Sequence, residues 1–199
     1  MIFNHPKMFD IPMSGKRYDI IYADPAWNYN SAGFADQARR YSKFRSAASV
    51  YHVMTPDELT ALPVNLIASD NCALFCWTTD THIPECINLC ENHWGFKFKT
   101  KAFEWVKQTK HGKWHIGLGH WTRANSESCF MFTKGSPKRD ENGKGVRRLV
   151  VDKIREHSRK PDRIRDDILT LMGDKPRIEL FARTAAPGWD AWGNEVGKF

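Results

Sequence analysis

The sequence predicts an α/β fold in which a mostly parallel sheet carries helices on its faces. Short apolar segments typical of buried strands alternate along the chain with segments that have helical periodicity. The chain has 199 residues, 41% of them hydrophobic, which suits a single domain over residues 1–199. Its 13% aromatic content, with eight Trp, excludes a generally disordered chain.

Two apolar segments, residues 18–23 and 72–78, have the composition of strands that are buried on both faces of a sheet. The first ends at Asp24 and Pro25, where proline cannot continue the hydrogen-bonded ladder. Three further segments are expected to be strands, namely residues 96–106, 128–133 and 177–182.

Three segments are expected to be helices, and each has a start or stop signal. Thr55 is the expected N-cap of the first, with Glu58 in the capping-box position, and this helix is expected to break near Pro63. The other two, residues 82–94 and 161–172, are each followed by a glycine, which commonly ends a helix.

The five cysteines are expected to be reduced and buried. Their number is odd and they lie in apolar segments, which argues against a disulfide framework. His82, Cys86 and Cys90 would share one face of a helix, which leaves a metal site open as an alternative. Small buried apolar side chains are the favoured interpretation, so no metal is expected.

The net charge of +7 is concentrated in two segments. Residues 134–163 contain eleven Lys or Arg against five Asp or Glu, and within them residues 134–148 are expected to form a basic loop. Residues 31–49 are expected to form a mobile basic loop with interleaved aromatic residues, whose cations are Arg39, Arg40, Lys43 and Arg45. Lys and Arg neutralise phosphates and aromatic rings stack on unpaired bases, so the expected partner is nucleic acid.

The sequence gives no indication of a membrane partner. No apolar run approaches the length of roughly 18 residues that a membrane-spanning helix needs. The N-terminus also lacks the basic segment, apolar core and cleavage site of a secretory signal. We therefore expect a cytoplasmic protein.

The segment from Asp24 to Trp27 follows a buried strand directly, at the edge of the sheet where α/β proteins bind ligands. Its carboxylate, rigid proline and large ring suit nucleophilic attack by the exocyclic amine of adenine, whose lone pair is delocalised into the ring. Asp24 and the Pro25 carbonyl are expected to accept the amine hydrogens without competing donors. Trp27 offers a stacking face for a base taken out of its helix. A proline-containing turn with a packing Trp is the simpler alternative.

Six short motifs occur along the chain in a fixed order. They are residues 22–27 (YADPAW), 74–78 (LFCWT), 117–123 (GLGHWTR), 159–162 (RKPD), 179–183 (ELFAR) and 188–195 (GWDAWGNE). In this order they resemble the MT-A family of adenine methyltransferases, named after the seventy-kilodalton subunit of the eukaryotic messenger-RNA enzyme, and in particular its compact bacterial and phage members. Ala26 stands where the family usually has a second proline, which predicts a looser turn.

The resemblance implies a Rossmann-like fold dependent on S-adenosylmethionine, with a permuted motif order, and methylation of the N6 amine of adenine. The residues implied to form the catalytic turn are Asp24, Pro25, Ala26 and Trp27. The residues implied to bind S-adenosylmethionine are Asp24, Lys160, Glu179, Phe181, Arg183, Asn194 and Glu195. Those expected to bind the nucleic acid are Tyr29, Arg39, Arg40, Lys43, Arg45, His120, Trp121 and Arg123.

The expected substrate is DNA before RNA, because the size resembles the bacterial and phage members and the sequence has no Cys/His cluster of an RNA-binding zinc finger. A homodimer or a partner subunit stays open. A dinucleotide oxidoreductase would need a third glycine after Gly117 and Gly119, and a helix opening there. A catalytically silent nucleic-acid-binding subunit is the main alternative, against which the joint presence of Asp24, Lys160 and Asn194 argues.

Overall fold

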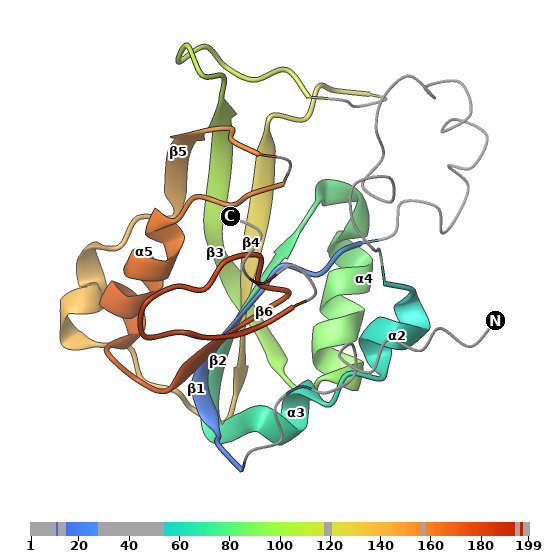
Figure 1. Ribbon diagram of the computed structural model, residues 1–199, viewed down its shortest axis with the longest axis vertical. Helices are drawn as coiled ribbons and strands as arrows, with labels where there is room; N and C mark the ends of the chain where they lie inside the picture. The colour runs from blue at the N-terminus through green and yellow to red at the C-terminus, as the bar shows by residue number, and fades with distance from the viewer. Residues whose placement is uncertain are drawn as a thin grey trace.

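The computed structural model describes residues 11, 15–27, 54–117, 121–156, 158–193 and 196. These residues form a seven-stranded sheet with the strand order β5-β3-β4-β2-β1-β6-β7, covered by helices on both faces (Figure 1). Strand β4 is antiparallel to its neighbours β2 and β3, and all the other pairs are parallel. The expected α/β fold with a mostly parallel sheet is confirmed.

The strands are β1 (Tyr18–Ala23), β2 (Ala68–Thr78), β3 (Lys97–Gln108), β4 (Ser126–Lys134), β5 (Leu149–Lys153), β6 (Arg177–Leu180) and β7 (Asp190–Trp192). The α-helices are α2 (Pro56–Thr60), α3 (Val64–Ile67), α4 (Ile83–Asn88) and α5 (Arg163–Met172). Two 3₁₀ turns span Asp80–His82 and Glu141–Gly145, and a π turn spans Leu89–His93. Among the described residues, no helix has the length and apolar character needed to cross a bilayer.

The central strands bury alternate residues on the two faces of the sheet. In β2, Leu74 and Cys76 belong to the core that includes residues of α2, α3 and α4, whereas Phe75 and Trp77 belong to the core that includes residues of α5. Because both faces are covered, both alternating sets are apolar. This explains why the strand segments are nearly continuous apolar runs in the sequence.

The helix boundaries follow the expected signals with one difference. The Thr55 hydroxyl accepts from the Glu58 amide at 3.2 Å, and the Glu58 carboxylate accepts from the Thr55 amide at 2.7 Å, which completes the expected capping box. Helix α5 ends at Gly173, which has φ of 82°. The second expected helix is instead divided into a 3₁₀ turn, α4 and the π turn, in which Trp94 donates to the carbonyl of Leu89.

The sequence pattern does not predict strands β5 and β7. Strand β5 directly follows the expected basic loop at residues 134–148, and β7 has only three residues. The loop itself contains the turn Glu141–Gly145 and is held against α5, because the Asp140 amide donates to the Leu171 carbonyl at 2.9 Å. The other expected loop, residues 31–49, lies outside the described residues.

Candidate active site

The carboxyl ends of the parallel strands and the beginning of antiparallel β4 meet at one edge of the sheet. Asp24 follows β1, Thr79 follows β2, and Glu127 is the second residue of β4. Lys160 reaches the same edge from the segment before α5. One pocket lies here, and its lining residues are Asp24, Pro25, Trp27, Thr78, Thr79, Glu127, Ser158 and Lys160.

Lys160 is the centre of a chain of opposite charges. Its Nζ lies 2.7 Å from Oδ2 of Asp24 and 3.2 Å from Oε2 of Glu127. The Nζ of Lys107 lies 2.5 Å from the other carboxylate oxygen of Glu127. Two carboxylates and two ammonium groups balance one another, so the chain as a whole has no net charge when all four groups are ionised.

Burial and the neighbouring charges act in opposite directions on these groups. Burial raises the pKa of Asp24 above its usual value, and Lys160 only partly offsets this. For Glu127, burial is outweighed by Lys160 and Lys107, which together hold its pKa below the usual value. Burial lowers the pKa of Lys160, but Asp24 and Glu127 raise it by more, so Lys160 stays charged at neutral pH. Both Asp24 and Lys160 line the pocket, and the Asp24 side chain is the more exposed of the two, at 26% against 8%.

The segment after β1 is a tight turn. The Trp27 amide donates to the Pro25 carbonyl at 2.9 Å, which closes a three-residue turn around Ala26. The Trp27 indole N–H donates to the Trp77 carbonyl at 3.1 Å, and its ring stacks on His82 with centroids 5.8 Å apart. Trp27 is only 9% exposed. One face of its ring is therefore covered by His82, and a base would have to stack on the other.

This turn corrects one expectation about the Pro25 carbonyl. That oxygen was expected to have no competing donor, yet it accepts a hydrogen bond from Trp27. The same expectation is wrong for Asp24, because its Oδ2 accepts from Lys160. The turn itself requires the bond from Trp27 to Pro25, because it closes the three-residue ring. A carbonyl oxygen has two lone pairs, so Pro25 keeps one for a substrate.

Several groups hold the Lys160 ammonium in place. Ser158 has a left-handed backbone with φ of 59°, and its carbonyl and hydroxyl accept from Nζ at 3.1 and 3.2 Å. Nζ also lies 5.6 Å from the centre of the Trp77 ring, whose indole N–H donates to the Tyr22 hydroxyl at 2.7 Å. A serine in this backbone conformation is uncommon and strained, and here it aims two acceptors at one ammonium.

Apart from Asp24 and Lys160, the described residues expected to bind the cofactor lie in or just after β6. Phe181 has φ of 62° and its ring meets Trp192 edge-on with centroids 5.5 Å apart, while Arg183 is partly buried two residues farther on. Both carboxylate oxygens of Glu179 accept from Arg165, at 2.6 and 3.0 Å, so this carboxylate is engaged in an ion pair. Asn194 and Glu195 lie outside the described residues.

The described residues expected to bind nucleic acid lie on the connection between β3 and β4. Trp121 is 93% exposed, and Arg123 is exposed as well. Trp114 and Ile116 on the same connection are also exposed. The remaining expected residues lie outside the described part of the chain, and they are Tyr29, Arg39, Arg40, Lys43, Arg45 and His120.

Glu127, which joins Lys160 to Lys107, is a site residue that the sequence does not predict. The sequence signal is weak, because Glu127 is a single acidic residue among the polar residues that precede the apolar part of β4. It reaches the pocket only because β4 runs antiparallel, which brings its amino end to the carboxyl edge of the other strands. A carboxylate preceding a strand would be recognised as a site residue once that strand's direction is known.

Comparisons with known proteins identify the family of the chain. The MT-A70 family matches residues 18–195. The chain is 35% identical to the Type II methyltransferase M.MunI from Mycoplasma sp, over 91% of this chain and 78% of that protein. It is 24% identical to the human N(6)-adenine-specific methyltransferase METTL4 and 27% identical to the human N(6)-adenosine-methyltransferase catalytic subunit METTL3, over 92% and 96% of this chain. It spans only 38% and 30% of those two proteins. The chain therefore belongs to the MT-A70 family, and its mostly parallel sheet is a Rossmann-like methyltransferase fold.

Proposed function

We propose that this chain transfers a methyl group from S-adenosylmethionine to the exocyclic N6 amine of adenine in nucleic acid, with DNA preferred over RNA. The observation that carries the proposal is the contact of Asp24 with the buried Lys160. Asp24 directly follows β1 and directly precedes the hydrogen-bonded turn of Pro25, Ala26 and Trp27. The position at the carboxyl edge of the sheet is where such folds bind ligands. The names of the relatives METTL4 and METTL3 support the N6 position of adenine as the target.

The adenine amine becomes a better nucleophile when acceptors hold its hydrogens and favour a pyramidal nitrogen. We assign this role to the Asp24 oxygen that does not bind Lys160 and to the remaining lone pair of the Pro25 carbonyl. Both acceptors are fixed before a substrate arrives, one by Lys160 and the other by the Trp27 amide. Glu127 is a positioning residue in this proposal, because it acts on the reacting amine only through Lys160, which it holds in place.

The donor set of the pocket fits S-adenosylmethionine. The amino-acid part of that molecule carries an ammonium and a carboxylate, which match Asp24 and Lys160 in charge. Lys160 would exchange one of its present acceptors, Asp24, Glu127 or Ser158, for the carboxylate. When bound, S-adenosylmethionine supplies a methyl group on a positively charged sulfur. The contribution of the chain is then orientation and charge placement around the reacting amine.

The remaining cofactor contacts are assigned by the family resemblance. Phe181 and Arg183 are proposed to face the adenine and ribose side, and Asn194 and Glu195 the ribose hydroxyls. Glu179 is proposed to bind the cofactor as well, which requires that it share its carboxylate with Arg165 or release it. This makes Glu179 the least favourably placed member of the set.

The preference for DNA rests on the extent of the resemblance. The match covers 78% of the Type II methyltransferase M.MunI but 30% of METTL3, whose name refers to adenosine. We therefore place DNA before RNA as the substrate.

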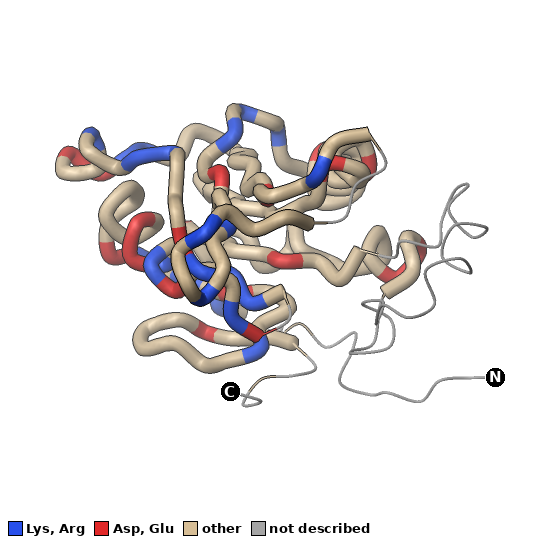
Figure 2. The backbone as a smooth tube through the Cα atoms, turned by 90° about the horizontal axis from the view of Figure 1, so that it is seen from above, with Lys and Arg blue, Asp and Glu red and all other residues tan. Residues whose placement is uncertain are grey.

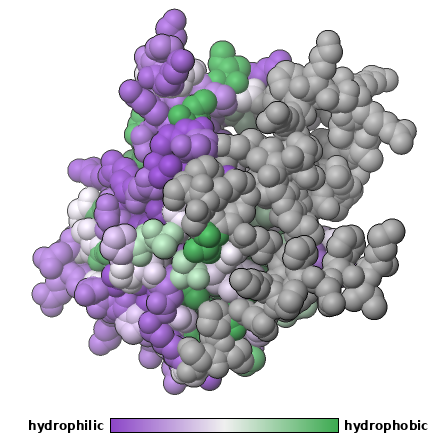
Figure 3. Space-filling model, in the orientation of Figure 1, coloured by the Kyte–Doolittle hydropathy of each residue, from purple (hydrophilic) through white to green (hydrophobic). Residues whose placement is uncertain are grey.

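Basic and aromatic side chains near the pocket are proposed to bind the nucleic acid. Lys and Arg are frequent on the side of the molecule that carries α5 (Figure 2), where Lys153, Arg155 and Arg163 are exposed. The face shown in Figure 3 is hydrophilic over most of the described residues, with small apolar patches between them. Phosphates are attracted by such a surface irrespective of base sequence.

The connection between β3 and β4 carries exposed rings. Trp114 is 60% exposed and Trp121 is 93% exposed, and the exposed Lys110 and Lys113 lie beside Trp114 in the sequence. The connection begins at the end of β3, where Lys107 binds the pocket residue Glu127. Aromatic rings beside cations suit unpaired bases that flank a target adenine.

The proposal is tested by supplying labelled S-adenosylmethionine with single-stranded DNA, duplex DNA and RNA of one sequence, and identifying the methylated base by mass spectrometry. We expect N6-methyladenine, formed faster in DNA than in RNA, and binding of S-adenosylmethionine by calorimetry. Faster methylation of RNA would overturn the substrate preference. Nucleic-acid binding without any binding of S-adenosylmethionine would overturn the proposed enzymatic activity and favour a catalytically silent nucleic-acid-binding subunit.

A further inference from the structure

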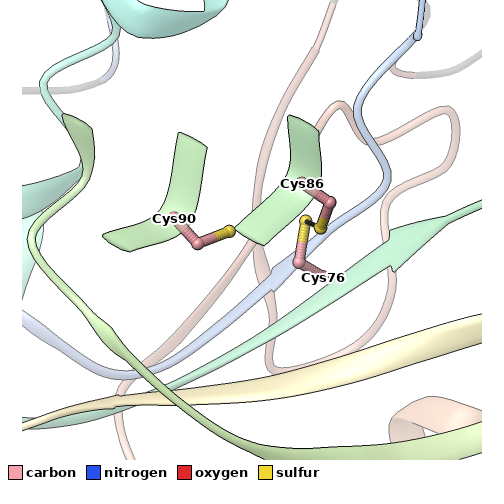
Figure 4. Close-up of side chains that lie close together, drawn as sticks. All are labelled: Cys76, Cys86 and Cys90. Carbon is pink, nitrogen blue, oxygen red and sulfur yellow. Dashed lines mark hydrogen bonds between the residues drawn. The ribbon is translucent and has the colours of Figure 1, made fainter. Parts of the chain in front are cut away.

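Three cysteines from separate parts of the chain converge on the α4 side of the sheet (Figure 4). Cys76 comes from β2, Cys86 from α4 and Cys90 from the π turn that follows α4. Their sulfur atoms all lie within 4.8 Å of one another, and those of Cys76 and Cys86 are 3.7 Å apart. All three side chains are fully buried. The sequence shows the two helical members together but not the strand cysteine that completes the group.

The spacing of the sulfurs suits a shared metal ion. With metal–sulfur bonds of about 2.3 Å, two thiolates on one ion lie roughly 3.8 to 4 Å apart. A disulfide would need about 2.05 Å between the sulfurs, and the five cysteines are free thiols. Within the described residues, this is the only group of three Cys, His, Asp or Glu whose donor atoms lie this close together.

The donors determine which kind of ion fits. Sulfur ligands select soft ions such as Cu(I) and Zn(II), and structural zinc sites are almost always four-coordinate. The nearby His82 directs Nδ1 to the hydroxyls of Thr79 and Thr81, at 3.0 and 3.1 Å, and stacks on Trp27. Three sulfurs without an imidazole match the lower coordination number that Cu(I) accepts.

We propose that Cys76, Cys86 and Cys90 form a three-coordinate binding site for Cu(I). The ion bonds to all three sulfurs as thiolates, and the three thiol protons released on binding pass to solvent. No sulfur changes its oxidation state.

The position of the site links it to the catalytic turn. Cys76 directly precedes Trp77, whose carbonyl holds the Trp27 indole, and Cys86 lies on the helix that follows His82. A bound ion would join α4 to β2 next to these contacts and so stabilise the turn. Access requires local opening of α4, which has only six residues and an exposed outer face.

The test is a titration of the reduced full chain with Cu(I) under anaerobic conditions, in competition with a chromophoric Cu(I) chelator. We expect one ion per chain, and X-ray absorption that shows three sulfur neighbours at about 2.3 Å. Cys86→Ala should weaken binding by more than about 100-fold, since even residues that only support a ligand are worth 10- to 100-fold. Cys72→Ala and Cys129→Ala remove buried cysteines outside the cluster and should bind as the wild type does.

A second measurement guards against a variant that does not fold. Cu(I) should raise the melting temperature of the wild type and of Cys129→Ala, but not that of Cys90→Ala. Failure of the wild type to compete with the chelator would overturn the site, as would unchanged binding in both cluster variants. Tighter binding of Zn(II) with a four-coordinate shell would overturn the assignment to Cu(I). None of these readouts depends on methyl transfer.

Discussion

Asp24 has both a proposed chemical role and a structural one. A carboxylate in a loop after a strand is ordinarily dispensable for folding, but this one is bonded to a lysine that is 8% exposed. Removing one partner of a buried pair costs roughly 3 to 5 kcal/mol. The cost here should lie at the lower end, because Asp24 is 26% exposed and Glu127 still partners Lys160. Asp24→Ala therefore tests stability and chemistry together.

Asp24→Asn separates the two roles. The amide oxygen can still accept from Lys160, so the folded state should be retained, whereas the negative charge aimed at the amine is lost. We expect the single-turnover rate of methyl transfer to fall by at least about 100-fold, the usual value of a charged or polar group aimed at a reacting centre. Asp57→Asn, on the exposed surface of α2, is the control and should keep the wild-type rate. A folded Asp24→Asn protein with a normal rate would remove Asp24 from the mechanism.

Glu127 makes the stability depend on pH in a defined direction. Lys160 and Lys107 hold its pKa in the folded protein below the unfolded value of about 4.3, so the unfolded chain binds its proton first as the pH falls. Its contribution to stability is therefore present above about pH 4.3 and is lost as the pH falls through the lowered pKa. Glu127→Gln should be less stable than the wild type at pH 7, and the difference should shrink below pH 4. Urea unfolding at several pH values measures this.

The control for Glu127 is Glu141→Gln, at an exposed position in the turn before β5. Its difference from the wild type in free energy of unfolding should be close to zero at each pH. A gap for Glu127→Gln that stays constant down to pH 3 would mean that its carboxylate is not stabilised by the two lysines.

The catalytic turn is an element whose sequence departs from the family. The three-residue turn closed by Trp27 and Pro25 places Ala26 at its centre, and Ala26 has a negative φ, so the turn is of the inverse kind. Inverse turns of this kind have a central φ near −75°, which lies within the range of proline. Ala26→Pro should therefore stabilise the protein by about 0.4 to 1 kcal/mol and preserve or raise turnover.

Thermal melts and single-turnover rates of Ala26→Pro and Ala26→Gly check this prediction. Glycine should act in the opposite direction, because it increases the freedom of the unfolded chain. A folded but inactive Ala26→Pro protein would show that the turn needs a backbone conformation that proline excludes.

Helix α2 depends on its capping box. It has only five residues, and isolated helices of this length are not stable in water. Thr55→Ala removes the hydroxyl that accepts from the Glu58 amide and should cost about 1 kcal/mol. Thr55→Ser keeps an equivalent acceptor and should cost much less, which thermal unfolding of the two variants measures. Equal losses in both variants would assign the effect to the methyl group of Thr55.

At the level of elements, the sequence predicts what is encoded locally. The apolar runs of β1 and β2 and the capping box of α2 are local signals, and the structure has them where they are expected. The π turn is not visible in the pattern, because its apolar positions continue those of α4. Strand β7 forms only by pairing with β6, and its three residues have no strand pattern of their own.

At the level of the whole molecule, the antiparallel direction of β4 is the feature that cannot be recognised from the sequence pattern. Asp24 and Lys160 are 136 residues apart, and each lies within one of the family motifs. Glu127 lies outside all six motifs. Glu127 joins the other two because β4 runs in the opposite direction, which brings its amino end to the carboxyl edge of the sheet. Asp24 and Lys160 can therefore be proposed as site residues from the sequence, whereas Glu127 cannot.

The overall basic charge predicts how nucleic-acid binding responds to salt. Replacing Arg39, Arg40, Lys43 and Arg45 by Ala should weaken DNA binding and raise the apparent Michaelis constant for DNA. Each lost phosphate contact lowers the slope of log affinity against log salt by about 1, so four contacts should flatten the slope by about 3 to 4 units. DNA affinity measured over a series of salt concentrations gives both slopes.

The control for this variant is the pair Lys97→Ala and Lys99→Ala, two exposed lysines at the amino end of β3 and thus at the opposite edge of the sheet from the pocket. Their removal lowers the net charge by two but should leave the salt slope close to that of the wild type. The four-fold variant should also keep its affinity for S-adenosylmethionine, because the proposed cofactor residues other than Asp24 lie after residue 150. Equal salt slopes in the wild type and the four-fold variant would mean that residues 31–49 make no phosphate contacts. Loss of cofactor affinity instead would mean that this segment is part of the cofactor pocket.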